Sequence, residues 1–487
     1  MTTPIRRVGL GIVVLMSLLV GQLTYVHLVR AERLNEDPAN VRLVLRDFAR
    51  SRGPIVTADG VVVANTVEVD DSYGFQRRYP FGGLYAHITG FQSLRYGLTG
   101  IERQYDDSLL GKRYEIGFAD LGGILAAEKP EGTVVLNVDS IAQVAARDAL
   151  GGNRGSVVVL DTVTGGVVAM YSNPTFDPNL LATHNPNAAQ AFFDAFVADP
   201  ANPMRSRAYR ERFPAGSTFK IATTGIGLDA GVTSPERSYP VLRELDLPLT
   251  DRTLSNFGGS ACGGTLAVSF RVSCNTTFGQ VGLDLGERLA QDMDNYGINT
   301  DSPDVDLSEP MVRSEGPLEG TFRSEAPLFA QAAIGQGPVA VTPMAMAMIA
   351  QAVANDGVML QPHFMREVLD RNGNVVDRSR PRRYRTAMTP ATAHDLTAMM
   401  IDVVAQGTGT AAQIPGFTVA GKTGTAQQPG GAPHAWFVGF APAGQPRYAI
   451  AVIVERGGDL GDEATGGRVA APIAARVLST LLSQRPR

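Results

Sequence analysis

Lysine is the residue that this chain of 487 residues most conspicuously lacks. Of its 43 basic residues only four are lysine, which leaves 39 arginines. The four are Lys112, Lys129, Lys220 and Lys422. Arginine therefore serves almost wherever a cation is needed, but a guanidinium keeps its proton at every ordinary pH. A position that retains lysine is thus a candidate for a cation that must give up its proton.

Cysteine and metal-binding histidine patterns are scarce as well. The six histidines are scattered and form no H-E-x-x-H motif, and no C-x-x-C motif occurs, so we expect neither a metal site nor another cofactor. The only cysteines are Cys262 and Cys274. An oxidising compartment would permit a disulfide between them, and two buried free thiols are the alternative.

The charge balance excludes one large class of partner. The net charge is -5, the isoelectric point is near 5.8, and no basic stretch is interleaved with aromatic residues, so we do not expect nucleic acid as a partner. With 44% hydrophobic and 19% charged residues, the composition is typical of a globular protein. The length allows roughly two to four domains.

One long apolar run lies near the N-terminus. Residues 8–29, "VGLGIVVLMSLLVGQLTYVHLV", are numerous enough to cross a bilayer as a helix. A cleaved signal peptide is the alternative, but its apolar core would be shorter and no clear A-x-A site follows. We therefore expect an uncleaved single-pass anchor, with residues 1–7 as a cytoplasmic tail and the remainder outside the membrane.

The remainder divides at about residue 130. Residues 30–130 are polar and predict a small extended module, whereas the patterns from 131 to 487 predict a larger α/β (α+β) domain. Its predicted strands form a five-stranded antiparallel sheet built from both ends of the domain, and they lie at 155–161, 165–171, 416–427, 434–442 and 447–455. Helices at 139–152 and 467–482 should flank this sheet, and residues 180–410 should form a helical subdomain packed against it.

The first candidate catalytic motif lies in "FPAGSTFKIATT", residues 213–224. Pro214 and Gly216 indicate a turn before a helix, so Ser217 falls near a helix N-terminus and Lys220 lies on the same face three residues later. A serine hydroxyl is a poor nucleophile until a base removes its proton, and lysine is such a base only when burial or a nearby cation lowers its pKa. A chance S-x-x-K on a surface helix is the alternative.

Two further motifs strengthen the catalytic interpretation. Ser273-Cys274-Asn275 is an S-x-N element, and Lys422-Thr423-Gly424-Thr425 is a K-T-G element on a predicted strand. Together with S-x-x-K, in this order, they are the signature of penicillin-binding proteins and related serine enzymes.

The chain resembles the membrane-anchored, monofunctional class B penicillin-binding proteins, and among them the short actinobacterial PbpA-like group. "RGPIVTADG" (52–60) and "GLTGIERQYDDSLLG" (97–111) are similar to two boxes of the family's N-terminal module, although the first departs from the family pattern at Ala58. "DTVTGGVVAMYSNPTFDPN" (161–179) and "HAWFVGFAP" (434–442) are similar to stretches of its transpeptidase domain. The resemblance implies the fold shared by penicillin-binding transpeptidases and serine β-lactamases.

The resemblance also implies a role for each motif residue in peptidoglycan D,D-transpeptidation. Ser217 would attack the stem peptide at its penultimate D-Ala, Lys220 would accept the Ser217 proton, and Ser273 would relay a proton to the leaving amine. The residues expected to bind the substrate are Asn275, Lys422, Thr423, Gly424 and Thr425. The backbone N–H groups of Ser217 and Thr425 would form the oxyanion hole, and β-lactams would acylate Ser217 in place of the substrate.

Other activities fit the same motifs. A D,D-carboxypeptidase or a β-lactamase would resolve the acyl-enzyme with water instead of an amine, and a catalytically inactive scaffold would only organise the cell-wall machinery. About 100 residues before the catalytic domain are too few for a glycosyltransferase module. The resemblance therefore implies a separate polytopic (SEDS-type) glycosyltransferase, together with other division or elongation proteins, as partners.

Overall fold

The structure is a computed structural model, and it describes residues 2–29, 48, 50–111 and 131–484. Lys112, Lys129 and the predicted module boundary at residue 130 lie outside the described residues. The chain divides into two compact units. One comprises Met1–Ser51 with Val67–Gln76, and the other comprises Arg52–Thr66 with Arg77–Arg487.

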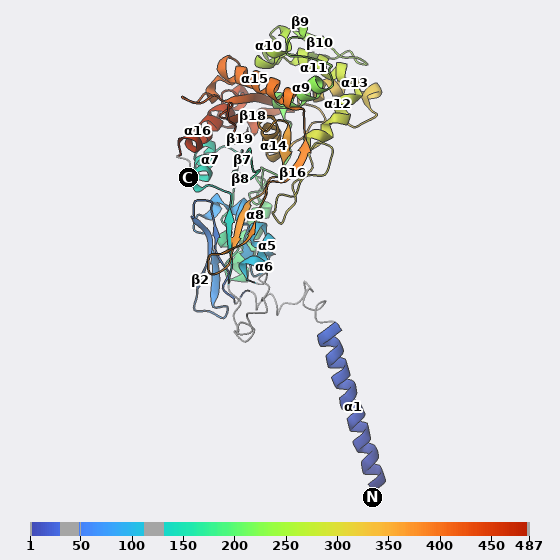
Figure 1. Cartoon of the computed structure of the whole chain (residues 1–487), viewed down its shortest axis with the longest axis vertical. Helices are drawn as coiled ribbons and strands as arrows, with labels where there is room; N and C mark the ends of the chain where they lie inside the picture. Colours follow the sequence, from blue (N-terminus) through green and yellow to red (C-terminus); the bar gives the residue numbers. More distant parts are fainter. Residues whose placement is uncertain (1, 30–47, 49, 112–130, 485–487) are drawn as a thin grey trace. The chain divides into compact units, whose positions relative to one another are not determined.

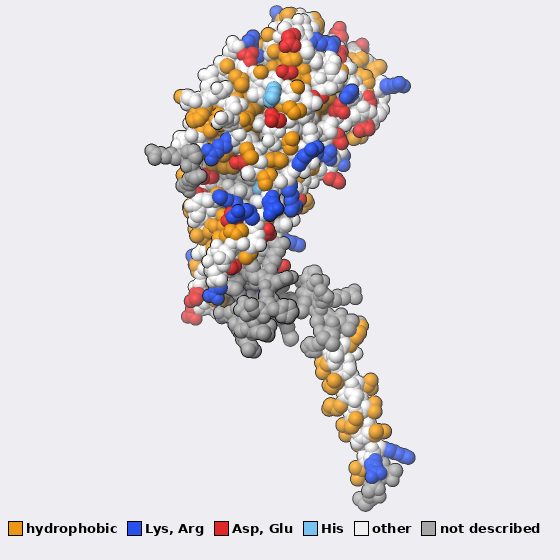
Figure 2. All heavy atoms as spheres, in the orientation of Figure 1, with side chains coloured by type: hydrophobic (Ala, Val, Ile, Leu, Met, Phe, Trp, Pro, Cys, Tyr) orange, Lys and Arg blue, Asp and Glu red, His pale blue; other side chains and the backbone are white. Residues whose placement is uncertain are grey.

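The first unit contains the predicted apolar helix, α1, at Thr2–Val29. Its segment Ile5–Val26 is, among the described residues, the one helix long and apolar enough to cross a bilayer. Hydrophobic side chains cover α1 along its length in Figure 2, and Arg6 and Arg7 stand near its start. A helix of this kind serves either as a membrane anchor or as a signal sequence.

The second unit contains the predicted five-stranded antiparallel sheet, in the order β17-β18-β19-β7-β8 (Figure 1). The strands are β7 (Gly155–Asp161), β8 (Val167–Asn173), β17 (Ala420–Gln428), β18 (Gly431–Ala441) and β19 (Tyr448–Val454). The pairing of β19 with β7 joins the two ends of the domain, as predicted. All residues of β19 are buried because helices cover both faces of the sheet. The covering helices are α7 (Ser140–Leu150), α14 (Pro343–Ala354) and α16 (Ala470–Ser483).

A second sheet, in the order β15-β14-β6-β1-β2-β3, builds the N-terminal module. Its strands are β1 (Ile55–Val56), β2 (Val62–Glu68), β3 (Phe75–Arg78), β6 (Thr133–Leu136), β14 (Met365–Leu369) and β15 (Val375–Arg378). β14 and β15 come from the region predicted to be helical. Residues 180–410 do contain the predicted helices, but they also contribute this hairpin to a distant sheet.

The two N-terminal sequence boxes meet in a buried ion cluster. Arg52 of the first box donates from Nε to Glu102 Oε2 at 2.6 Å, and Arg77 donates from Nε to Glu102 Oε1 at 2.6 Å. Arg52 also pairs with Asp106. Burial alone would raise the pKa of Glu102, but the guanidinium groups of Arg77 and Arg52 hold it below its ordinary value. The two sequence boxes therefore supply residues of the buried ion cluster in the N-terminal module.

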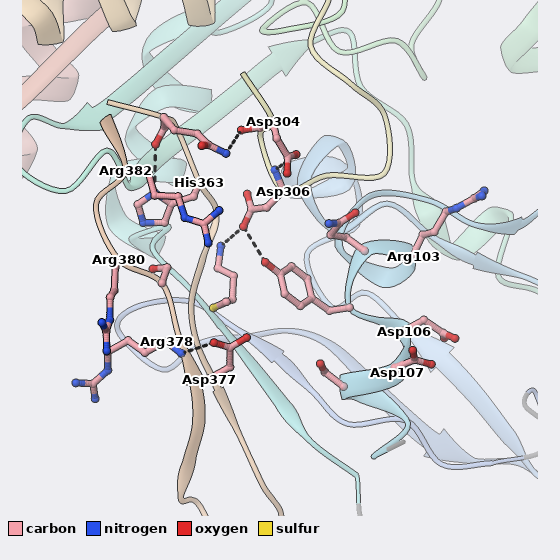
Figure 3. A pocket seen from close by; sticks show the side chains of 16 residues that line it. Arg103, Asp106, Asp107, Asp304, Asp306, His363, Asp377, Arg378, Arg380 and Arg382 are labelled. Atoms are coloured by element: carbon pink, nitrogen blue, oxygen red, sulfur yellow. Dashed lines mark hydrogen bonds between the residues drawn. The ribbon is translucent and has the colours of Figure 1, made fainter. Parts of the chain in front are cut away.

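A polar cavity of about 660 Å³ lies where α5 (Gly100–Gln104) and α6 (Asp106–Leu109) approach the segment that leads into β14 (Figure 3). The Asp306 carboxylate accepts hydrogen bonds from Tyr105 Oη at 3.0 Å, Phe364 N at 2.7 Å and Met365 N at 2.8 Å. One side chain thus connects the module to the catalytic domain.

Replacing the carboxylate of the ion cluster should destabilise the second unit. Glu102→Gln removes the carboxylate that pairs with buried Arg77 and one of the two that pair with buried Arg52, and we expect a loss of about 3 kcal/mol in the free energy of unfolding. Denaturant unfolding measures this loss. Asp148→Asn is the matched control, because the Arg147–Asp148 pair is exposed, and it should change stability by less than about 0.5 kcal/mol. Equal effects of the two variants would contradict the prediction.

Candidate active site

The candidate nucleophile lies in a tight turn before a helix. Ser217 is in the 3-10 turn η3 (Gly216–Phe219), which leads directly into α9 (Lys220–Asp229), as the sequence predicted. Gly216 has a φ of 53°, and a Cβ there would stand 2.9 Å from the carbonyl oxygen of Thr425. Glycine therefore lets the serine segment approach β17 closely.

The amine of Lys220 is directed at the S-x-N motif. Its Nζ donates to the carbonyl oxygen of Ser273 at 2.8 Å and to Asn275 Oδ1 at 2.9 Å, and it lies 3.4 Å from Ser273 Oγ. Lys220 is completely buried. In the described part of the chain no hydrogen bond joins this amine to Ser217 Oγ.

The second motif lysine reaches the same hydroxyl. Lys422 Nζ donates to Ser273 Oγ at 2.9 Å and to the carbonyl oxygen of Thr423 at 3.0 Å. Ser273 therefore lies between two amines. Its φ of 63° is in the left-handed region, which non-glycine residues rarely adopt and which is typical of strained functional positions.

Burial makes both lysines weaker bases than usual. Burial, followed by the neighbouring charge of Lys422, lowers the pKa of Lys220 well below its ordinary value. Burial lowers the pKa of Lys422 to about 7. Two ammonium groups this close and this dry repel each other, so one proton is lost first. Burial and the charge of Lys422 both act on Lys220, whereas burial alone acts on Lys422, so Lys220 is the candidate general base and Lys422 the candidate cation.

These groups open onto a cleft of about 690 Å³ along the edge strand β17. Ser217, Ser273, Asn275, Thr423 and Thr425 line it. The structure thus brings together the side chains of all three motifs.

Gly424 of the K-T-G motif lies close to the segment that carries the candidate nucleophile. A Cβ at Gly424 would stand 3.0 Å from the carbonyl oxygen of Ala215 and 3.1 Å from the amide nitrogen of Thr218. The glycine therefore allows β17 to pack against the segment that carries Ser217.

Two residues of the site were not predicted from the sequence. Asn256 Oδ1 accepts from the backbone N–H of Asn275 at 2.9 Å and of Thr276 at 3.0 Å, and so caps α11 (Asn275–Leu285). Thr408 Oγ1 lies 2.6 Å from Thr423 Oγ1 at the cleft wall. Asn256 acts across 19 and 20 residues and Thr408 across 15, and no local pattern marks either one.

Cys262 and Cys274 form a disulfide, with their Cα atoms 5.7 Å apart. Cys262 opens β12 (Cys262–Thr265), and Cys274 is the residue before α11. The bridge and the Asn256 cap both hold the segment that presents Ser273 and Asn275.

Known proteins are similar to this chain in sequence and in fold. Residues 155–479 match the model of the penicillin binding protein transpeptidase domain, and residues 52–135 match that of the penicillin binding protein A dimerisation domain. The peptidoglycan D,D-transpeptidase PbpA of Mycolicibacterium smegmatis is 36% identical, over 99% of this chain and 100% of its own length. The protein of the same name from Mycobacterium tuberculosis is 35% identical, over 100% of both chains.

Solved structures give the same result. The ceftriaxone acyl-enzyme complex of penicillin-binding protein A from M. tuberculosis superposes with a TM-score of 0.84 and 33% identity, covering 90% of this chain and 100% of that one. Its penicillin G acyl-enzyme complex superposes with a TM-score of 0.82 and 34% identity, covering 89% and 100%.

Opening the disulfide should impair the site more than the fold. Cys262→Ser frees the segment before α11, and catalytic groups displaced by about 1 Å can lose about 10²-fold in rate. We expect covalent labelling by fluorescent penicillin to slow at least about tenfold, while the melting temperature falls by only a few degrees. Unchanged labelling together with a large fall in melting temperature would show that the bridge serves stability alone.

Proposed function

The chain belongs to the family of penicillin-binding protein transpeptidases, and we propose that it cross-links peptidoglycan stem peptides through an acyl-enzyme formed on Ser217. The observation that carries this assignment of the nucleophile is the buried Lys220 amine. It has a lowered pKa, lies three residues from Ser217 and is held by the S-x-N motif. β-Lactams would acylate the same serine.

In the first half-reaction Ser217 Oγ attacks the carbonyl carbon of the penultimate D-Ala. Its proton passes to the neutral Lys220 amine, and the backbone N–H groups of Ser217 and Thr425 stabilise the oxyanion. The C–N bond then breaks, and the leaving D-Ala amine takes a proton from Ser273. Ser273 recovers a proton from the protonated Lys220, whose Nζ lies 3.4 Å from Ser273 Oγ, so Lys220 is neutral again. The products are free D-Ala and the acyl-enzyme.

In the second half-reaction an amine from a neighbouring stem peptide attacks the ester. The amine loses a proton to the Lys220–Ser273 pair, the ester bond breaks, and Ser217 regains its hydrogen. Before the terminal D-Ala leaves in the first half-reaction, the hydroxyls of Thr423 and Thr425 would hold its carboxylate, with Lys422 as the positive charge behind them. Thr408 would position the Thr423 hydroxyl, because the two oxygens are 2.6 Å apart.

Substitutions in the S-x-x-K motif test this assignment. Ser217→Ala should abolish labelling by fluorescent penicillin and leave the fold intact, because only a hydroxyl is lost. Lys220→Arg should be as inactive as Lys220→Ala, since a guanidinium retains its charge but cannot accept the proton. We expect acylation to fall by at least about 10² in both. Label on Ser217→Ala would refute the nucleophile, and an Arg variant within tenfold of wild type would assign Lys220 an electrostatic role.

The lifetime of the label separates transpeptidation from its rivals. A β-lactamase on this fold loses the label quickly because water resolves the acyl-enzyme, whereas a transpeptidase keeps it. A catalytically inactive scaffold is never labelled. Cross-linked product from a defined lipid-linked substrate is the direct measurement.

We also propose that α1 is an uncleaved anchor with the catalytic domain outside the membrane, and that residues 1–130 dock on a separate polytopic glycosyltransferase. The apolar length of α1 supports the first proposal. The match of residues 52–135 to a dimerisation domain, which is an interaction module, supports the second.

A chimera tests the docking proposal. Exchanging residues 1–130 for an unrelated anchor and spacer should preserve penicillin labelling if the exchanged protein folds, but should abolish function in cells. Complementation of a deletion strain is the measurement, and labelling of the same cells is the control. Full complementation by a labelled chimera would contradict the proposal.

A further inference from the structure

One buried histidine contacts both of the segments that carry the proposed oxyanion hole. His434 is on β18, where it pairs with Ala426 of β17, and it is only 7% exposed. Its ring meets Phe213, four residues before Ser217, and it also bonds the backbone of Arg456. His434 is not among the described residues that line the cleft. Any effect it has on the chemistry must therefore act through these neighbours.

The first contact is with the segment that carries the nucleophile. The rings of His434 and Phe213 meet edge to face, with their centroids 5.5 Å apart. Two residues further along β18, Trp436 donates from Nε1 to the carbonyl oxygen of Pro214 at 3.0 Å. Residues two apart on a strand share a face, so neighbouring side chains of β18 hold Phe213 and Pro214 together. Ser217 follows Pro214 by three residues.

The strand β17 leaves room for these contacts. Its residues opposite Trp436 and His434 are Gly424 and Ala426, which have the smallest side chains available. A Cβ at Gly424 would already stand 3.0 Å from the carbonyl oxygen of Ala215. The nucleophile segment therefore lies against the sheet closely enough for the two rings of β18 to reach it.

The second contact is with the segment that packs beside Thr425. His434 Nδ1 accepts from the backbone N–H of Arg456 at 3.0 Å. Burial lowers the pKa of His434, so its ring is neutral and Nδ1 is free to accept. Arg456 has a φ of 47°, a conformation that non-glycine residues rarely adopt. The chain then leads to Gly466, whose backbone N–H donates to Thr425 Oγ1 at 3.4 Å.

We propose that His434 is a positioning residue that holds the backbone N–H groups of Ser217 and Thr425 at the spacing that an oxyanion requires. This inference rests on the proposed acyl-enzyme chemistry. Loss or displacement of one oxyanion donor can slow a reaction about 10²-fold, so a small shift of either segment would slow acylation. Noncovalent binding depends on the cleft wall, which His434 does not join, so it should stay unchanged.

The concentration dependence of labelling by fluorescent penicillin separates binding from acylation in the full chain. His434→Ala loses both contacts, and we expect the limiting acylation rate constant to fall at least about tenfold while the apparent dissociation constant changes less than about twofold. An unchanged rate constant, or a loss confined to affinity, would overturn this inference alone. A wild-type chain that penicillin does not label would instead overturn the proposed function.

Two further variants test whether the histidine connects the two segments. His434→Phe retains a ring against Phe213, whereas His434→Asn retains a side-chain acceptor for the Arg456 N–H. Each should acylate at a rate between those of wild type and His434→Ala. Full recovery by either variant would overturn the connecting role, because one contact alone would then suffice.

His87 of α4 (Ala86–Thr89) provides a matched control for lost packing. Its half-buried ring meets Phe176 edge to face, with centroids 5.7 Å apart, and its Nε2 bonds the carbonyl oxygen of Pro203 at 2.8 Å. His87→Ala thus removes the same two kinds of contact away from the cleft. The melting temperature should fall by a few degrees in both alanine variants, but acylation by His87→Ala should stay within about twofold of wild type. Equal slowing in the two variants would overturn the proposal.

Discussion

The convergence of two buried amines on one serine hydroxyl is the constraint on which the rest of this structure depends. Lys220 and Lys422 both reach Ser273 Oγ, at 3.4 and 2.9 Å, and neither amine has access to water. Such an arrangement is stable only if one amine is neutral, and a neutral amine beside a serine is what acyl transfer requires. Burial, and after it the repulsion from Lys422, lowers the pKa of Lys220 and so lets its neutral amine act as a base.

Holding that arrangement requires several elements from distant parts of the chain. Ser273 sits in a left-handed conformation, and the disulfide and the Asn256 cap hold the segment around it. Gly216 and Gly424 let the nucleophile segment and β17 approach without an intervening Cβ. The five-stranded sheet and its helices supply the burial that makes this strain tolerable, in keeping with the general cost of active sites to stability.

The sequence predicted those features that depend on residues close together in the chain, such as helix ends and sequence motifs. Helix α7 starts where Asp139 Oδ1 accepts from Ala142 N at 2.9 Å and ends at Gly151, and the three motifs meet in one cleft as their family signature implied. The hairpin β14–β15 was missed, because its partner strand β6 lies some 230 residues earlier and pairing at that distance leaves no local signal. Asn256 and Thr408 were missed for the same reason, since each acts on a motif through a contact that only the fold creates.

Arginine and lysine have different roles in this chain, and the effects of burial and neighbouring charges on their pKa values explain the difference. In the N-terminal module, burial alone would lower the pKa of Arg52, but Glu102 and Asp106 raise it above its ordinary value, so this buried cation keeps its proton. Arg207 is likewise buried and bonds Glu455 Oε1. Both arginines have carboxylate partners because their task is to hold structure. Neither motif lysine has one in the described residues, and a carboxylate beside Lys220 would raise its pKa and end its use as a base. Among the described residues that line the cleft none is acidic, and this is a condition of the proposed catalysis.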